Sequence, residues 1–487
     1  MIDLLLNWDT LFLIILCINI IFIISVVFFE RKNPSATLAW VMALLFLPVA
    51  GFILYLFFGQ TYRKDKMFRL KKEEDQKLQD LIESEKKELM KEKMKAQVDH
   101  TSAKLRRMIL MLLQNNDAII TINNQVTVYT DGKEKFAALI RDIQAATDFI
   151  HLEYYIWKDD GIGNDLRIAL TERARAGVEI RLLCDGLGCT GLHRHFFDEF
   201  KEAGGKVTVF FPSFLRILNL RYNYRNHRKI AVIDGKTCYI GGFNIGDDYL
   251  GLDKEWGYWR DTAVRIQGYA VLTAQIRFFL DWNFAAKEDL LEYEDRYFPD
   301  SADVPGTPIQ VVSGGPDTVF NPVKESYLKM INIATESVYL QSPYFIPDES
   351  VLDALRIAAL SGIDVRIMMP NRPDHPFVYW AGMSYIRQLL DSGVKAYTYD
   401  NGFLHAKTIV IDEIVASVGS ANWDVRSFRL NFETNAVMYD PVVAKELKEK
   451  FLKDLDVCSP ITFARLDALP WGKRVLQSIA RLFSPML

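Results

Sequence analysis

This sequence is poor in cysteine and has no excess of positive charge. Five cysteines occur in 487 residues, and the formal net charge is −4. No two cysteines form a C-x-x-C pair or a Cys/His metal-ligand spacing, so we expect free or buried thiols, no metal site and a reducing compartment. The net charge gives no general attraction to nucleic acid, so no nucleic-acid partner is expected.

Long uncharged hydrophobic runs are present, and two lie near the start of the chain. Residues 11–29 and 36–58 contain no charged side chain, and each is long enough to cross a bilayer, which takes about 20 residues. A cleaved signal peptide is the alternative for the first run, but no basic residue precedes it and no small-x-small cleavage site follows. We therefore predict an anchor of two transmembrane helices within residues 1–60.

Charges around the two runs predict their orientation. The loop between them carries Arg31 and Lys32 against Glu30. The flank after the second run carries Arg63, Lys64, Lys66, Arg69, Lys71 and Lys72. The positive-inside rule places the loop outside and the remaining chain in the cytoplasm, as a multi-pass protein of the cell membrane. Residues 61–116 are expected to form a charged helical linker, and its Lys- and Glu-rich run from about Arg69 to His100 an ion-paired, solvated helix.

A nine-residue motif occurs twice in the rest of the chain. Residues 226–234 read Asn-His-Arg-Lys-Ile-Ala-Val-Ile-Asp, and residues 404–412 read Leu-His-Ala-Lys-Thr-Ile-Val-Ile-Asp. The first copy is closed by Gly-Gly-Phe-Asn and the second by Gly-Ser-Ala-Asn, after the same gap. The β-branched apolar run in each copy is typical of a buried strand.

The strand geometry gives the motif its chemistry. Side chains two apart on a strand project from one face, so His227 and Lys229 face one space, and His405 and Lys407 do likewise. An imidazole beside an ammonium, supplied twice, suits a phosphate diester. One His attacks phosphorus, the other protonates the departing alkoxide, and the lysines hold the oxyanions without a metal. A single His-x-Lys pair would most often be accidental, but two matched copies are not.

Other segments repeat in the same order, which predicts the fold. Residues 146–153 resemble residues 334–341, and residues 177–183 resemble residues 362–368, each after an Ala/Leu-rich helical stretch. Alternating strands and helices imply an α/β fold with a mostly parallel or mixed sheet flanked by helices. We expect two tandem repeats, residues 117–300 and 301–460, that form a pseudo-dimer. Because each repeat has one motif His, the reactive pair must lie where the repeats meet.

The pattern H-x-K-x4-D-x6-G-[GS]-x-N resembles the signature of the phospholipase D superfamily, and both copies are complete. The resemblance implies the same duplicated architecture and these catalytic residues: His227, Lys229, Asp234, His405, Lys407 and Asp412. It implies a phosphate- or substrate-binding role for Gly242, Asn244, Ser420 and Asn422. The second position of the closing turn is Gly242 in the first copy and Ser420 in the second. A hydroxyl contact to phosphate at this position would therefore come from the second copy alone.

Four further residues are candidates for the site. Downstream acids orient the histidines in this superfamily, which suggests that role for Asp261 and Glu433; a surface acid or an ion pair is the alternative. Glu153 ends an apolar strand, where ligands of open α/β sheets bind, and Gln341 is its repeat partner. We therefore expect Glu153 and Gln341 to line the pocket.

Two segments have the composition of lipid-contacting elements. Residues 214–224 alternate arginines with aromatic and aliphatic residues, as at a lipid interface; base stacking and an ordinary strand with a basic loop are the alternatives. The tail, residues 461–487, contains apolar residues at helical spacing with basic residues opposite. We expect an amphipathic helix there that lies at the membrane surface or packs on the enzyme.

Within the superfamily, these features most resemble bacterial cardiolipin synthases. The resemblance implies phosphatidyl transfer from one phosphatidylglycerol to a second, giving cardiolipin and glycerol through a phosphatidyl-histidine. It favours His227 as nucleophile, although the two motifs are nearly symmetric. Diesters of similar energy are exchanged, so no nucleotide or other cofactor is expected. A phospholipase D, another phosphatidyltransferase, a tethered nuclease and a non-catalytic membrane scaffold remain as alternatives, and the oligomeric state is open.

Overall fold

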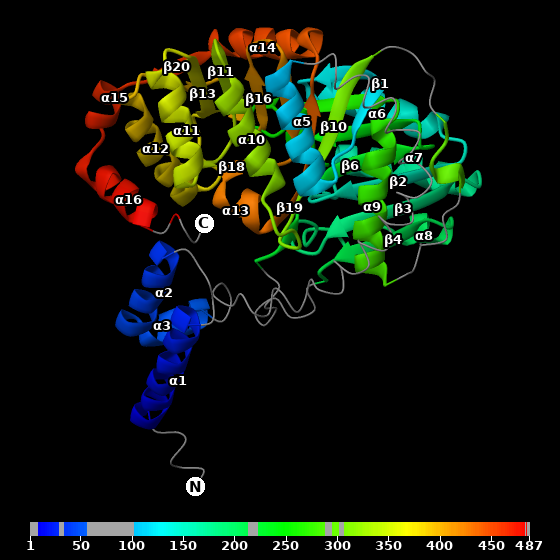
Figure 1. Ribbon diagram of the computed structural model, residues 1–487. Coiled ribbons are helices and arrows are strands. Elements are labelled where there is room, and N and C mark those ends of the chain that lie inside the picture. Colours follow the sequence, from blue (N-terminus) through cyan, green and yellow to red (C-terminus); the bar gives the residue numbers. More distant parts are fainter. Residues whose placement is uncertain are drawn as a thin grey trace. The chain divides into compact units, whose positions relative to one another are not determined.

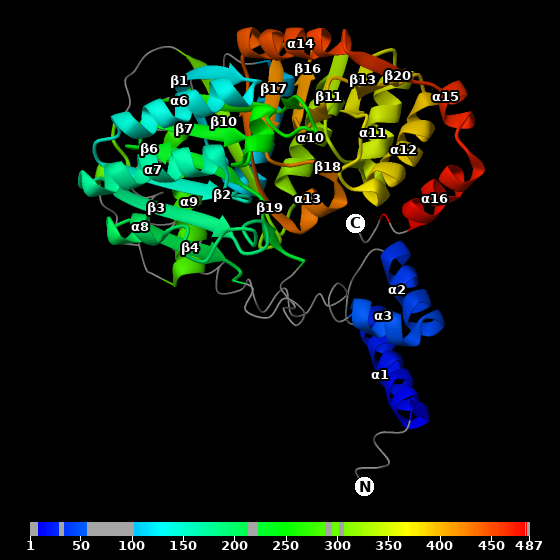
Figure 2. The ribbon, with the colours of Figure 1, turned by 180° about the vertical axis from the view of Figure 1, so that it is seen from behind.

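The computed structural model describes residues 8–28, 34–55, 102–212, 223–287, 295–300, 306–482 and 484. Within them the chain forms an N-terminal helical unit and a large α/β unit, both drawn in Figure 1 and Figure 2. The predicted basic loop and basic flank, the lipid-interface segment at residues 214–222 and the linker up to residue 101 lie outside the described residues.

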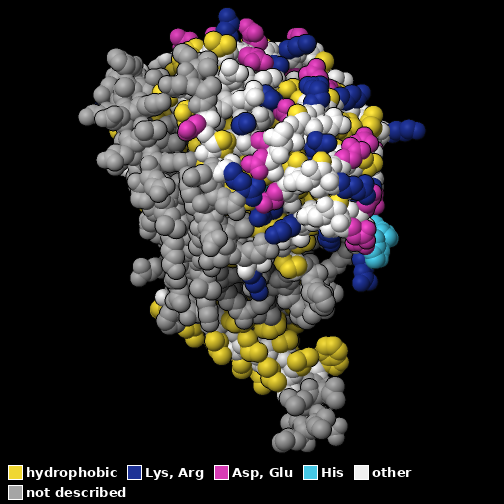
Figure 3. All heavy atoms as spheres, turned by 90° about the vertical axis from the view of Figure 1, so that its right-hand side faces the viewer, with side chains coloured by type: hydrophobic (Ala, Val, Ile, Leu, Met, Phe, Trp, Pro, Cys, Tyr) yellow, Lys and Arg dark blue, Asp and Glu magenta, His cyan; other side chains and the backbone are white. Residues whose placement is uncertain are grey.

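The first helix of the helical unit has the length and composition of a membrane span. Helix α1 (Trp8–Phe28) has 21 residues, nearly all apolar, and it is the one helix of the described ranges that meets both criteria. In Figure 3 the described side chains of the helical unit form an almost uniformly hydrophobic surface. The visible face of the α/β unit instead mixes basic and acidic side chains.

The second predicted span is interrupted in the structure. It forms α2 (Pro34–Phe46) and α3 (Pro48–Leu54), because Pro48 begins a new helix after the non-helical residue Leu47. The two helices pack on α1, where the Asn19 amide donates to the carbonyl oxygens of Leu44 and Pro48 at 3.2 and 2.9 Å. The expectation of one continuous helix over residues 36–58 is therefore wrong.

The strands of the α/β unit belong to two consecutive sets. The first set is β1 (Ile120–Tyr129), β2 (Phe149–Tyr154), β3 (Glu179–Asp185), β4 (Lys206–Phe210), β6 (Lys229–Ile233), β7 (Thr237–Gly241) and β9 (Ala263–Gln267). The second set is β10 (Thr307–Gly314), β11 (Ser337–Gln341), β13 (Asp364–Pro370), β14 (Lys395–Tyr399), β16 (Thr408–Ile411), β17 (Val415–Gly419), β19 (Asn431–Met438) and β20 (Cys458–Ile461). Strands β1 and β10 pair antiparallel and join both sets into one sheet.

The sheet is mixed, which is one of the two forms, mostly parallel or mixed, that the sequence predicts. In each set the parallel pairs are β2–β3–β4 and β11–β13–β14. The strands of the duplicated motif, β6 and β16, instead run antiparallel to β2 and β11 and turn back into β7 and β17. The chain enters each motif strand from the edge where β2 or β11 ends, so both motif histidines start at that edge.

Helices cover both faces of the sheet. The first set carries α6 (Gly132–Ala145), α7 (Gly161–Arg175), α8 (Asp198–Glu202) and α9 (Ala270–Ala286). The second carries α10 (Pro322–Ile333), α11 (Glu349–Leu360), α12 (Pro376–Leu390), α13 (Val425–Arg429), α14 (Pro441–Leu455), α15 (Phe463–Asp467) and α16 (Trp471–Leu482). On β2, Ile150 and Leu152 join the core of α6 and α7, while the intervening His151 stacks on Phe278 of α9. Strand β11 alternates likewise between the α10 core and α14.

One repeated glycine has a conformational cause. Gly177 after α7 and Gly362 after α11 both have φ of +89°, a conformation that favours glycine. In the first repeat the next amide, of Val178, donates to the Arg173 carbonyl, and in the second the Ile363 amide donates to the Ala358 carbonyl. Each of these hydrogen bonds ends its helix before the following strand begins.

The last part of the predicted linker belongs to the α/β unit. Residues Ala103–Asn116 form helix α5, which begins at the capping residue Ser102. Met108, Ile109 and Leu112 of α5 are fully or almost fully buried in the core of the second set. The charged linker predicted over residues 61–116 therefore ends before this segment, because apolar residues recur there at helical spacing.

Candidate functional site

The two motif histidines are held by backbone contacts between the repeats. Short strand β5 (Arg225–Asn226) pairs with β19 of the second repeat, and the His227 amide donates to the Phe432 carbonyl at 2.9 Å. Strand β15 (Phe403–Leu404) pairs with β8 (Trp259–Arg260) of the first repeat, and the His405 amide donates to the Arg260 carbonyl at 2.7 Å. Each histidine is therefore anchored on the repeat that does not contain it.

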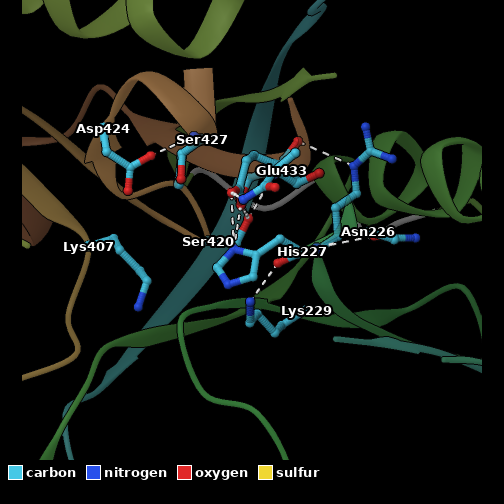
Figure 4. A network of polar contacts seen from close by, with 12 residues as sticks. Asn226, His227, Lys229, Lys407, Ser420, Asp424, Ser427 and Glu433 are labelled. Carbon is cyan, nitrogen blue, oxygen red and sulfur yellow. Dashed lines mark hydrogen bonds and ion pairs between the residues drawn. The ribbon is translucent and has the colours of Figure 1, made fainter. Parts of the chain in front are cut away.

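The two candidate acids contact the histidines crosswise. His227 Nδ1 lies 3.0 Å from both carboxylate oxygens of Glu433, as Figure 4 shows. His405 Nδ1 lies 2.6 Å from Oδ2 of Asp261. Glu433 and Asp261 are completely buried. Each acid follows one motif in the sequence and contacts the histidine of the other motif.

The Gly/Ser difference between the motifs follows from the lengths of the two acids. A Cβ on Gly242 would lie 2.1 Å from Oδ1 of Asp261, so a side chain there would displace this carboxylate. In the other repeat the Ser420 hydroxyl donates to Oε2 of Glu433 at 2.6 Å, while its oxygen accepts from the Thr434 amide. In the structure the Ser420 hydroxyl thus contacts the acid Glu433.

Both motif lysines are buried beside the histidines. Lys229 Nζ donates to the His227 carbonyl at 2.6 Å, and Lys407 Nζ to the His405 carbonyl at 2.5 Å. Burial lowers the pKa of Lys229 to about 7 and that of Lys407 to about 8, and the charge of Lys407 contributes to the first shift. Figure 4 shows the Lys229 ammonium next to the His227 ring and Lys407 on a separate segment, and the charges of both lysines act on His227. Burial therefore destabilises both ammonium groups, and a bound anion would stabilise them.

Both imidazoles are neutral in this site at neutral pH. Burial lowers the pKa of His227 to about 4 although Glu433 opposes the shift, and burial with the Lys407 charge lowers that of His405 to about 4. A carboxylate at Nδ1 fixes the proton on that nitrogen, which leaves a lone pair on Nε2. The interactions of Glu433 with His227 and Lys229 keep its pKa below the ordinary value despite its burial. The His227 dyad is therefore a neutral imidazole on a charged Glu433.

The two motif aspartates lie away from the histidines. Asp234 accepts hydrogen bonds from the amides of Thr147, Asp148 and Phe149, where β2 begins. Asp412 binds the same positions of the second repeat, Thr335, Glu336 and Ser337. Each aspartate is the fifth residue after its motif lysine, which is roughly 16 Å along a strand. The expected catalytic contact is replaced by a turn that ties β6 to β2 and β16 to β11.

The asparagines that close the motifs have different surroundings. Asn244 accepts from the Ile156 amide at 3.1 Å and donates to the Tyr249 hydroxyl at 2.8 Å, and the Tyr249 ring lies 6.0 Å from that of His405. Asn422 is buried, and its Oδ1 has no hydrogen-bond partner among the described residues. Asn244 thus supports the wall of the site, whereas Asn422 holds a buried acceptor oxygen that lacks a partner among the described residues.

Glu153 and Gln341 lie behind the motif strands. Glu153 lies on the same face of β2 as His151, the face that α9 covers. Tyr154, which pairs with Lys229, lies on the other face. The Glu153 carboxylate accepts a hydrogen bond from the Asn226 side chain. Gln341 donates to Asp454 of α14 at 2.8 Å. The expectation that these residues line the pocket is corrected by this alternation, because they support the segments that carry the histidines.

Aromatic and acidic residues beside the dyads were missed by sequence reasoning. The Tyr155 ring lies 4.9 Å from that of His227 and 5.4 Å from Lys229 Nζ. Asp424 is buried, burial raises its pKa to about 6, and its charge raises the pKa of Lys407. Only the position of Tyr155 just after Glu153, at a strand end, signalled proximity to the site.

The structure contains unpaired cysteines and no grouped metal ligands among its described residues. All five cysteines are free thiols. In the part of the chain that the structure describes, no three His, Cys, Asp or Glu side chains are grouped as metal ligands would be.

Comparisons with known proteins place the chain in a family. Residues 139–270 and 327–455 match the family model described as "Cardiolipin synthase, PLD-like domain", and residues 17–60 match "Phospholipase_D-nuclease N-terminal". The prediction of two tandem repeats is thereby confirmed. The crystal structure of phosphatidylserine synthase from Haemophilus influenzae Rd KW20 has the same fold, with a TM-score of 0.60, 14% identity and coverage of 79% of this chain and 98% of that chain.

Full-length relatives narrow the family further. The chain is 50% identical over 470 residues to the major cardiolipin synthase ClsA of Bacillus subtilis (strain 168), covering 96% of this chain and 97% of the relative. It is 47% identical over 479 residues to cardiolipin synthase of Staphylococcus aureus (strain N315), covering 98% and 97%. The chain therefore belongs to the cardiolipin synthase family of phospholipase D-like proteins.

Proposed function

We propose that this protein transfers a phosphatidyl group from one phosphatidylglycerol to the headgroup hydroxyl of another, which yields cardiolipin and glycerol. The crosswise pairing of His227 with Glu433 and of His405 with Asp261 is the observation that carries the proposal. It supplies two activated imidazoles and two lysines where the repeats meet, which is the set of groups that diester exchange needs.

The lysines bind the anionic phosphate. Their ammonium groups bond to the carbonyls of His227 and His405 in the structure, and a phosphodiester provides stronger, charged acceptors. The phosphate charge raises the pKa of both lysines and of both histidines, because it stabilises the protonated forms. Substrate binding thus helps to protonate the histidine that acts as the acid and the lysines that bind the anion.

In the first step Nε2 of one imidazole attacks phosphorus as the bond to the glycerol oxygen breaks. The second imidazole, which takes up a proton on Nε2 once the bound phosphate has raised its pKa, gives that proton to that oxygen, and glycerol leaves. In the second step the headgroup hydroxyl of another phosphatidylglycerol attacks phosphorus. The second imidazole takes the hydroxyl proton, the phosphorus–nitrogen bond breaks, and cardiolipin leaves. Both histidines return to their starting protonation states.

We assign His227 as the nucleophile and His405 as the acid and base. The nucleophile becomes a phosphatidyl-imidazolium that is positively charged, and both oxygens of Glu433 lie 3.0 Å from Nδ1 of His227 to stabilise that charge. Nδ1 of His405 has Lys407 Nζ at 2.9 Å, and this cation lowers the pKa of His405, which favours release of its proton to the leaving oxygen. The two half-sites therefore differ although their motifs are alike.

The proposal is tested with purified protein and vesicles that contain phosphatidylglycerol. We expect cardiolipin and glycerol in equal amounts, with no nucleotide added. His227→Ala and His405→Ala should each abolish turnover. Phosphatidic acid as the main product would identify a phospholipase D, and the absence of any lipid product would identify a non-catalytic scaffold.

We further propose that the protein is a multi-pass protein of the cell membrane with its catalytic repeats in the cytoplasm. Helix α1 supports one span, and the basic flank at residues 63–72 supports the orientation. Helices α2 and α3 form the second, broken pass within the anchor, residues 1–60. Alkaline phosphatase fused after residue 487 tests this orientation, since a cytoplasmic C-terminus leaves the fusion inactive.

A further inference from the structure

Helix α16 is packed along one side on the α/β unit. Its Ala480 is completely buried against Ile346 of β12 (Phe345–Ile346) and Ala381 of α12. Lys473 Nζ lies 5.5 Å from the Trp380 ring of α12, and Figure 1 shows α16 beside α12 at the end of the chain. The expected tail helix therefore has a fixed seat on α12, which orients its remaining surface.

The side of α16 that faces away from this seat is apolar. Trp471 is 79% exposed, Leu482 76% and Ile479 42%. At about 100° per residue these three side chains fall within an arc of about 80°, and each lies about 100° or more from Ala480. Large apolar side chains are seldom exposed together on a surface that meets only water, so this arc marks a contact surface.

Two arginines border the apolar arc of α16. Arg474 and Arg481 lie within about 80° of Trp471 at one border of the apolar arc, and the helix contains no acidic residue. An apolar arc with a tryptophan at one end and basic side chains at its border fits the boundary between lipid headgroups and acyl chains. We propose that α16 docks on an anionic lipid bilayer, with Trp471, Ile479 and Leu482 inserted and the basic residues on the headgroups.

The residues under α16 connect to the part of the site that contains His405 and Lys407. Ile346 pairs with Asp424 across β12 and β18 (Trp423–Asp424), and Asp424 acts electrostatically on Lys407. Helix α12 begins just after Asp374, which accepts a hydrogen bond from the Tyr344 hydroxyl on the approach to β12. Docking would therefore present bilayer lipids next to the Lys407 side of the site. This consequence rests on the proposed function, whereas the docking itself does not.

The kinetic test replaces apolar arc residues by charge in the full-length enzyme. In mixed micelles we expect Leu482→Glu and Trp471→Glu to raise the phosphatidylglycerol mole fraction for half-maximal rate about fivefold or more, with the rate at saturation unchanged. Val442→Glu is the matched control, because Val442 is an apolar residue 77% exposed on α14. Equal values for all three variants and the unmodified enzyme would overturn the proposal.

The physical test needs no catalysis and so separates docking from the proposed function. Full-length protein is placed in nanodiscs of phosphatidylcholine with or without phosphatidylglycerol, and hydrogen exchange is followed by mass spectrometry. We expect the amides of residues 471–482 to exchange more slowly in the anionic discs, and Leu482→Glu to remove the difference. Exchange in α14 serves as the internal reference. Equal exchange of α16 in both discs, or protection that tracks self-association instead of lipid charge, would refute docking.

Discussion

Replacement of Asp261 by asparagine separates the two half-sites. Asp261 follows the first motif in the sequence, yet its carboxylate lies 2.6 Å from Nδ1 of His405 in the second motif. Asn keeps the size of the side chain and removes its charge. If the crosswise contact operates in catalysis, Asp261→Asn impairs the acid His405 and leaves the nucleophile His227 intact.

The expected loss follows from the burial of this contact. Asp261 is completely buried, so solvent does not screen its charge. A hydrogen bond to a charged partner contributes about 1.5–3 kcal/mol, and each 1.36 kcal/mol changes a rate tenfold. The structure therefore predicts a decrease in kcat of about 10- to 150-fold with phosphatidylglycerol as the donor.

The assay uses a donor whose leaving group needs no proton. With phosphatidyl-p-nitrophenol, release of nitrophenol in the first turnover depends on the nucleophile and the anion hold, but hardly on an acid. Asp261→Asn should then regain a first-turnover rate within about threefold of the unmodified enzyme. Glu433→Gln is the matched variant and should stay slow with both donors, because Glu433 supports His227.

The opposite pattern would refute the reasoning. If Asp261→Asn stayed slow with the nitrophenyl donor and Glu433→Gln were restored, each acid would serve the histidine of its own motif or the roles would be reversed. Thermal melting of both variants checks that the buried substitution leaves the fold intact.

Three further predictions concern the lysines, the glycine and the turn. Lys229 and Lys407 have pKa values of about 7 and 8 in the empty site. A pH profile of kcat/KM for phosphatidylglycerol should therefore fall as the pH rises through this range. A flat profile to pH 9 would contradict the binding of the anion by charged lysines. Gly242→Ala should lower kcat at least about tenfold, since its Cβ displaces Asp261, whereas Gly472→Ala, with open space around it, serves as the control. Asp234→Ala should lower the free energy of unfolding by about 1–3 kcal/mol with kcat per folded molecule unchanged; a loss of activity at full stability would return Asp234 to the catalytic set.

The sequence carried enough information for the repeats and for the histidine and lysine pairs. Motif spacing is a local property, and strand periodicity alone places His227 and Lys229 on one face. Which acid meets which histidine is a long-range property, since the crosswise contacts arise only when β5 pairs with β19 and β15 with β8. Nothing near Asp261 in the chain signals this partner.

Other differences also have local physical causes. The parity that separates Asp234 from His227 was visible in the sequence, but its binding to the start of β2 depends on the register of β6 against β2. Glu153 ends a strand as expected, yet alternation turns its side chain to the α9 face. Pro48 marks a possible break in an apolar run, and the packing of α2 and α3 on α1 decides that the break occurs.

The number of phosphatidyl groups that one chain accepts tests the central claim most directly. The enzyme is mixed with phosphatidyl-p-nitrophenol without an acceptor, quenched in alkali after one turnover, and the chain and its peptides are weighed by mass spectrometry. One shared site predicts a single phosphatidyl group per chain, on the peptide that contains His227. Two groups per chain, one each on His227 and His405, would show two separate sites and contradict the account.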